Sequence, residues 1–137
     1  MRRTLLASFA AITAVLSLGL APSPANAAPR VSCIWYNTTT GGGLNGRTML
    51  AVCRLGNYVG EVRGKHRNLG DHSHTGYLEI KQGTKKRTSP TVEVLPGDDY
   101  DGPWWHINEN WPSGHRVCAV WVKANGSKTS GYACWTK

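Results

Sequence analysis

The chain has 137 residues, of which 16 are Lys or Arg and 8 are Asp or Glu, so its formal net charge is +8. This length fits one folded domain, and the basic balance favours acidic partners, either anionic polymers and glycans or acidic proteins. No basic stretch is interleaved with aromatic side chains, so we expect no nucleic-acid binding.

The first 27 residues have the features of a signal peptide. They begin with a pair of arginines, continue with a mostly apolar run, and end with Ala25-Asn26-Ala27, which offers small residues for cleavage. No second apolar segment follows, so we expect no membrane insertion. The sequence therefore predicts a secreted, extracellular protein whose single domain spans residues 28–137. The leader carries two of the sixteen basic residues and no acidic one, which leaves a mature net charge of +6.

Short apolar runs, punctuated by Gly, Pro and Asn, fill the mature chain. The expected strands are residues 31–36, 48–55, 57–63, 77–81, 91–94, 104–108, 116–123 and 130–135. Polar loops are expected over residues 37–47, 64–76, 82–89 and 96–103. Outside the leader, no window shows a helical apolar period. The pattern predicts an all-β fold, either an antiparallel β-sandwich (immunoglobulin-like) or a barrel of about seven strands.

The last hairpin gives the clearest strand register. Its arms, residues 116–123 and 130–135, flank an Asn-Gly turn signal. Pairing them symmetrically about Gly126 places Val122 opposite Ser130 and brings the cysteines of the two arms opposite each other. The hairpin is therefore expected to carry a crosslink.

All four cysteines lie in the mature part, and an even number in an exported chain predicts two disulfides. We favour Cys33 with Cys53 and Cys118 with Cys134, because each pair closes a local hairpin. Loops of this length are each worth about 3 kcal/mol in the chain-entropy model. A zinc site is the alternative, but no two cysteines have C-x-x-C spacing.

The loop expected over residues 64–76 holds the most suggestive chemistry. His72 and His74 are two apart, so on an extended segment both imidazoles would face the same way, with His66 and Asp71 nearby. This arrangement makes His72 and His74 candidate ligands for zinc or copper. A solvated polar loop is the alternative reading, and we expect no cofactor.

Signs of catalysis are few. The chain has no Gly-x-Ser-x-Gly elbow, and its cysteines are expected to be oxidised. The aspartates at positions 98, 99 and 101 suit a turn better than a calcium loop. A glycosidase needs two carboxyl groups at a defined distance, and the sequence does not give the distance between Asp98, Asp99 or Asp101 and Glu109. We therefore expect no enzyme, with a small antibacterial hydrolase as the remaining alternative.

Two stretches are candidate partner-binding sites. Trp104 and Trp105 are adjacent on an expected strand, so one should enter the core while the other is available to a partner or a sugar. Ala28, Pro29 and Arg30 would form a free tail that could enter a partner's cleft or extend its sheet.

The arginine-rich leader, the segment 76–80 and the ends 117–121 and 132–134 resemble those of small secreted, disulfide-stapled β proteins of actinomycetes. In build the chain resembles secreted hydrolase inhibitors and the adaptor subunits of umbrella-shaped toxin particles, although the Trp-Arg-Tyr triplet of amylase inhibitors is absent. The resemblance implies a non-enzymatic extracellular module that binds another secreted or surface protein, as an adaptor or an inhibitor. A carbohydrate or cell-wall binding module is the alternative.

Overall fold

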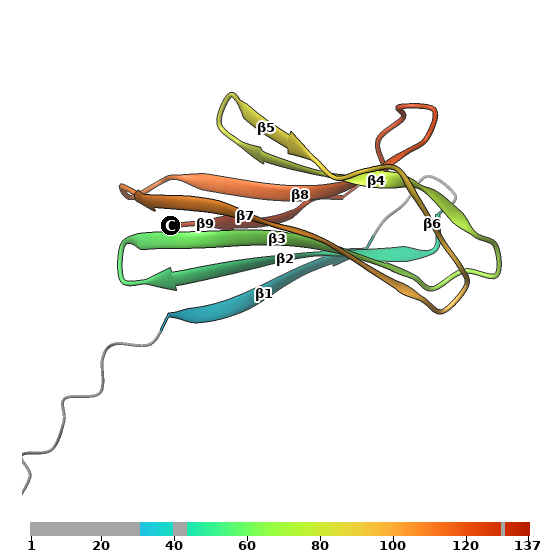
Figure 1. Ribbon diagram of the computed structural model, residues 1–137, viewed down its shortest axis with the longest axis horizontal. Coiled ribbons are helices and arrows are strands. Elements are labelled where there is room, and N and C mark those ends of the chain that lie inside the picture. Colours follow the sequence, from blue (N-terminus) through green and yellow to red (C-terminus); the bar gives the residue numbers. More distant parts are fainter. Residues whose placement is uncertain (1–30, 40–43, 130) are drawn as a thin grey trace, which may run out of the picture.

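Regular structure in the computed structural model is entirely β over the residues it describes, 31–39, 44–129 and 131–137 (Figure 1). Sheet A has the strand order β1-β2-β3-β7 and consists of β1 (Ser32–Thr39), β2 (Gly46–Leu55), β3 (Tyr58–Asn68) and β7 (Asp99–Asn110). Sheet B has the order β5-β4-β8-β9 and consists of β4 (His74–Gln82), β5 (Lys85–Thr88), β8 (Arg116–Lys123) and β9 (Ala133–Thr136), with β6 (Val92–Val94) also paired to β4. All pairs are antiparallel, so the prediction of an all-β sandwich is confirmed, and the open edges of both sheets exclude the closed barrel.

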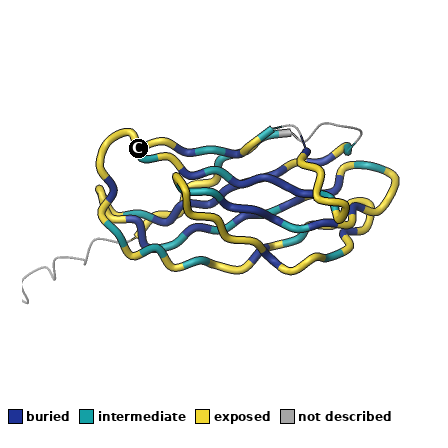
Figure 2. The backbone as a smooth tube through the Cα atoms, turned by 90° about the horizontal axis from the view of Figure 1, so that it is seen from above, coloured by how far each residue is buried: buried dark blue, intermediate teal, exposed yellow. Residues whose placement is uncertain are grey.

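The core lies between the two sheets, where alternate residues of the central strands point inward. Its larger cluster comprises Leu50, Val52, Val59, Val62, Ile80, Trp111, Val117, Ala119, Ala133 and Trp135. A smaller cluster, Leu78, Val94 and Trp121, fills the other end. Buried positions follow the middle of the strands, while the connecting turns are exposed (Figure 2). This packing makes both outer faces available for other contacts.

Two disulfides tie an edge strand of each sheet to its neighbour. Cys33 and Cys53 are register partners on β1 and β2, with Cα atoms 3.9 Å apart. Cys118 and Cys134 are register partners on β8 and β9, with Cα atoms 4.1 Å apart. Both predicted pairings are confirmed, and two disulfides are compatible with an extracellular protein.

The last hairpin keeps its predicted register at the disulfide but not near its turn. Val122 forms a bridge with Lys128, so the predicted pairing with Ser130 is wrong. The backbone NH of Lys123 donates to the carbonyl of Ser127 at 3.0 Å, which closes a turn tighter than the symmetric one. Thr129 then donates through its hydroxyl to the carbonyl of Trp121 at 2.7 Å. Between Thr129 and β9, the second arm therefore contains more residues than a symmetric pairing with the first arm would place there.

The loop predicted over residues 64–76 is largely strand. β3 continues to Asn68, and β4 begins at His74, because polar residues of this stretch point inward and find partners there. The side-chain amide of Asn68 donates to the carbonyls of His72 at 2.7 Å and Val94 at 2.9 Å. The loop prediction is wrong because it took polar residues to be exposed, whereas His66 and Asn68 are fully buried.

Three other predicted loops are shorter than expected. β1 extends to Thr39 and β2 begins at Gly46. β5 lies within the predicted turn 82–89 and pairs with β4 after a two-residue turn, in which Gly83 adopts φ 57°. β7 begins at Asp99, inside the predicted loop 96–103, because the charged residues there alternate toward solvent.

The predicted signal peptide and the tail Ala28, Pro29 and Arg30 lie outside the described residues. Over the ranges that the structure describes, no helix has the length and hydropathy that a membrane crossing requires.

Candidate functional site

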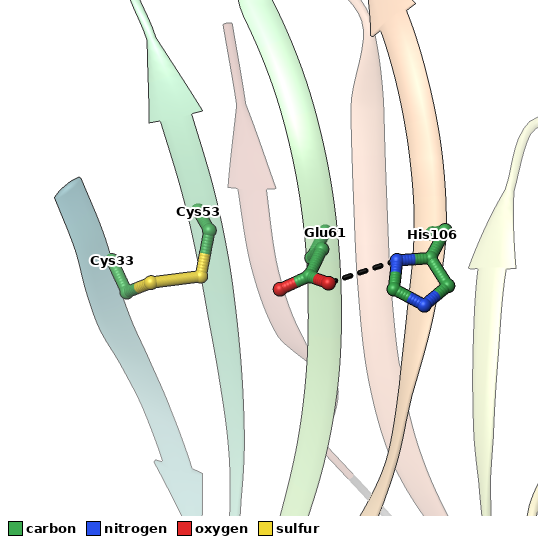
Figure 3. Close-up of a disulfide and its surroundings, with 4 residues drawn as sticks. All are labelled: Cys33, Cys53, Glu61 and His106. Carbon is green, nitrogen blue, oxygen red and sulfur yellow. Dashed lines mark ion pairs between the residues drawn. A yellow bond between two sulfur atoms is a disulfide. The ribbon is translucent and has the colours of Figure 1, made fainter. Parts of the chain in front are cut away.

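Side chains on the outer face of sheet A form rows that the strand register sets. The first row contains Cys33, Cys53, Glu61 and His106, as Figure 3 shows. The second contains Trp35, Ala51, Arg63 and Trp104, and the third contains Asn37, Met49, Lys65 and Asp101. We call the group Trp35, Met49, Arg63, Lys65 and Trp104 the aromatic face.

Two exposed indoles stand at opposite ends of the second row. Trp35 on β1 is 41% exposed and Trp104 on β7 is 37% exposed. Three strand spacings separate their Cα atoms, which is about 14 Å. Ala51 and Arg63 lie between them in the row, and Ala51 is fully buried beneath its larger neighbours. Large aromatic side chains left on a sheet surface are a feature that core packing does not explain.

Each indole is contacted by a cation from β3. The Arg63 guanidinium carbon lies 5.3 Å from the centre of the Trp104 ring, and Lys65 Nζ lies 5.7 Å from the centre of the Trp35 ring. Such contacts are worth about 0.5–1 kcal/mol at exposed sites. They favour the ring orientations seen in the structure over other side-chain conformations.

The two cations are themselves fixed by β7. Arg63 donates through Nε to the carbonyl of Gly102 at 2.8 Å and forms an ion pair with Asp101 at 3.4 Å. Lys65 Nζ lies 3.4 Å from Asp99 and 3.3 Å from Asp101. Asp99 and Asp101, which were expected to form a turn, therefore form ion pairs with the two cations that contact the indoles.

A polar border closes the end of the face beside the disulfide. His106 Nδ1 lies 2.8 Å from a Glu61 carboxylate oxygen (Figure 3). The Tyr58 hydroxyl donates to the side-chain oxygen of Asn108 at 2.9 Å. Asn108 has φ 53°, an uncommon conformation for a residue other than glycine, at a register shift between β3 and β7.

The structure separates the predicted pair of tryptophans as strand geometry requires. Trp104 lies on the aromatic face, whereas Trp105 is half-buried and packs against the core. Sequence reasoning missed Trp35, Arg63 and Lys65 as members of this site. The alternation of charge along residues 61–67 was the available signal, but the stretch was divided between a strand and a loop.

His72 and His74 do not form the site that their spacing suggested. The side chain of His72 is 90% exposed on the turn after β3, whereas His74 is buried. The ring of His74 instead meets His66, with Nδ1 and Nε2 3.0 Å apart. Among the described residues, no group of three or more His, Cys, Asp and Glu side chains could hold a metal ion.

The His66–His74 pair packs against the smaller core cluster through Trp121. His66 stacks on Trp121 with ring centres 4.1 Å apart, and its Nδ1 is buried with no hydrogen-bond partner in the described part of the chain. Burial, and after it the neighbouring His74, lowers the pKa of His66 from 6.5 to about 3. Burial followed by the charge of Lys123 also lowers the pKa of His74. Both rings are therefore neutral near pH 7.

Comparison with known proteins gives no match: neither a protein-family model, nor a curated protein, nor a solved structure matches the chain. The aromatic face is thus the feature from which a function has to be inferred.

Proposed function

We propose that the chain is a non-enzymatic extracellular module that binds another protein through its aromatic face. The observation that carries this proposal is the pair of exposed indoles held in place by Arg63 and Lys65 on a disulfide-tied sheet. Trp, Arg, Met and Tyr are the residue types enriched in protein interfaces and their hot spots. Side chains that are ordered in advance lose little conformational entropy when a partner binds.

The aromatic face is smaller than a typical protein interface, so the partner must also contact residues around it. Four strands of this length offer about 500 Å² of flat sheet. A stable interface buries about 800 Å² on each partner, so the contact has to extend past the face. Strand β1 is an edge of sheet A, where Ile34 on the strand is 39% exposed and Val31 directly before it is 53% exposed. The partner is therefore expected to cover β1 and the tail residues Ala28, Pro29 and Arg30 that precede it.

Such a module would act outside the cell, either as an adaptor subunit of a secreted complex, such as a toxin complex, or as an inhibitor of a secreted hydrolase. The predicted leader and the two disulfides support export. A hydrolase is not favoured, because Asp99 and Asp101 are engaged by β3 cations and Glu109 is engaged by Lys85 at 3.1 Å.

A carbohydrate or cell-wall binding module is the second candidate. It is favoured by the same two indoles, whose faces suit stacking on sugar rings. The cations over Trp35 and Trp104 occupy part of the rings that a sugar would use, and this places protein binding first.

Replacing both indoles tests the proposal. In Trp35→Ala/Trp104→Ala, we expect affinity for the native partner to fall at least about tenfold, because hot-spot residues of this type contribute about 2 kcal/mol or more. The fold should survive, since both side chains are exposed. The measurement is affinity capture of the tagged mature protein from its own culture supernatant, with mass spectrometry and then titration of the captured species.

Leu95→Ala is the control, because Leu95 is a large apolar residue, 55% exposed, directly after β6 of the other sheet. A protein retained by the wild type and by Leu95→Ala but lost by the double variant supports the proposal. Equal retention by all three proteins would sink it. Retention on peptidoglycan or chitin that disappears with the two indoles would instead establish the glycan-binding alternative.

A further inference from the structure

A basic groove crosses one end of sheet B, on the opposite side of the molecule from the aromatic face. Hollows of about 390 Å³ and 370 Å³ share Lys81 and Gly83, and a third of about 300 Å³ adjoins them at Gly83 and Arg116. Together they are lined by Lys81, Gly83, Thr84, Lys85, Lys86, Gly114, His115, Arg116, Cys118, Tyr132 and Cys134. No carboxylate is among these lining residues.

Three cations follow one another along the groove. Lys81 and Lys86 are register partners on β4 and β5, which places their Cβ atoms about 5 Å apart. Lys81 is also the register partner of Cys118 on β8, and Arg116 lies two residues away on the same face, a diagonal of about 7–8 Å. The order Lys86, Lys81, Arg116 thus makes a linear array rather than a single point of charge.

A buried carboxylate beneath the array fixes its lysines. Glu79 is 2% exposed, and its oxygens lie 3.6 Å from Lys81 Nζ, 3.5 Å from Lys86 Nζ and 3.0 Å from Lys128 Nζ. Burial alone would raise the pKa of Glu79, but the hydrogen bond and charge of Lys128, with the other two lysines, lower it. One carboxylate against three ammonium groups leaves an excess of positive charge.

Arg116 adds NH donors that are not paired with a carboxylate of the described residues. Its Nη2 lies 3.3 Å from Cys134 Sγ, a weak acceptor, and the described residues give it no ion pair. A guanidinium offers two parallel NH groups that match the oxygens of a phosphate. Tyr132 adds a hydroxyl on the same wall of the groove.

We propose that this groove binds a linear polymer with phosphodiester charges, of the kind found on extracellular surfaces. Successive charges of such a polymer are several ångströms apart, as are Lys86, Lys81 and Arg116, and its chain would lie along adjoining hollows. Tyr132 and His115, the two ring side chains that line the groove, belong to different hollows, so the described lining offers no row of aromatic side chains for successive bases, and the polymer is one without nucleobases. This inference does not depend on the aromatic face, which lies on the other sheet.

Calorimetric titration of the oxidised mature protein with poly(glycerol phosphate), in 20–200 mM salt, tests the proposal. Binding should weaken as salt increases, because it releases counterions from the polymer. Arg116→Gln should weaken binding about fivefold and flatten the salt dependence. Glu79→Gln should strengthen binding by a similar factor, because it removes the negative charge that lies next to Lys81 and Lys86 while keeping the shape of the side chain.

Arg67→Gln is the matched control, since it removes the same charge from β3 of sheet A. Unchanged affinity in Arg67→Gln, together with opposite shifts in Arg116→Gln and Glu79→Gln, supports the groove. An equal loss in Arg67→Gln would overturn it by showing that net charge alone attracts the polymer. No binding at 20 mM salt, or equally tight binding of poly-glutamate, would also overturn the assignment to a phosphate polymer.

Discussion

Gly76→Ala is expected to destabilise the fold by about 3 kcal/mol, although it adds a single methyl group. Gly76 lies on β4 and is buried against β8. A Cβ atom at this position would stand 2.2 Å from the carbonyl oxygen of Val122 and 2.9 Å from the Trp121 indole. Neither neighbour can yield easily, because one is sheet backbone and the other is a fully buried ring in the smaller core cluster. Urea unfolding followed by tryptophan fluorescence measures the loss, which corresponds to roughly 15 °C in Tm.

Gly60→Ala is the control for this prediction. A Cβ atom at Gly60 would have no neighbour closer than 3.6 Å, so the added methyl group meets ordinary contacts. The free energy of unfolding should then change by less than about 1 kcal/mol. If Gly76→Ala were as stable as Gly60→Ala, the close packing of Trp121 against β4 would be wrong.

Features that depend on neighbouring residues were predictable from the sequence. Each disulfide joins the two arms of one hairpin, so the symmetry of the turn located Cys33 opposite Cys53 and Cys118 opposite Cys134. The period-two apolar pattern likewise predicted the sandwich. Even within the last hairpin, the prediction failed where Thr129 bonds to Trp121, because side-chain hydrogen bonds near a turn are not visible in a symmetric pairing.

Features that depend on distant partners were not predictable. His66 reads as a loop residue, and only the facing His74 and Trp121 make its inward position favourable. The aromatic face shows the same limit, because Trp35 and Trp104 lie far apart in the sequence. They share a row only through the combined register of four strands. A sequence pattern identifies which residues leave the core, but not which of them meet.

The buried His66–His74 pair makes stability depend on pH. The folded-state pKa of His66 is about 3, against 6.5 for the free side chain. Below pH 6.5, His66 therefore binds a proton in the unfolded chain but stays neutral in the folded chain. The free energy of unfolding consequently falls as the pH falls. The loss is about 1.4 kcal/mol per pH unit, or about 2 kcal/mol between pH 6.5 and pH 5.

Between pH 6.5 and pH 5, the loss of stability comes from the histidines and not from the carboxylates. The pKa values of Glu79 and Glu109 are also lowered from 4.5, so the stability that these groups contribute is lost only at more acidic pH. Lys123 lies beside His74 and disfavours its protonation as well, so His74 adds to the loss in the same direction. Protonation of the pair would place charge next to Trp121, where no carboxylate of the described residues compensates it.

Urea unfolding at pH 7, 6, 5.5 and 5 measures the predicted slope, and His66→Gln is expected to remove most of it. His72→Gln is the control, because this histidine is exposed on the neighbouring turn, and it should leave the slope in place. The imidazole resonances of the folded wild type give a readout that needs no variant: the His66 signals should stay those of a neutral ring down to about pH 4. Titration of the His66 signals near pH 6.5 would contradict the buried, neutral pair.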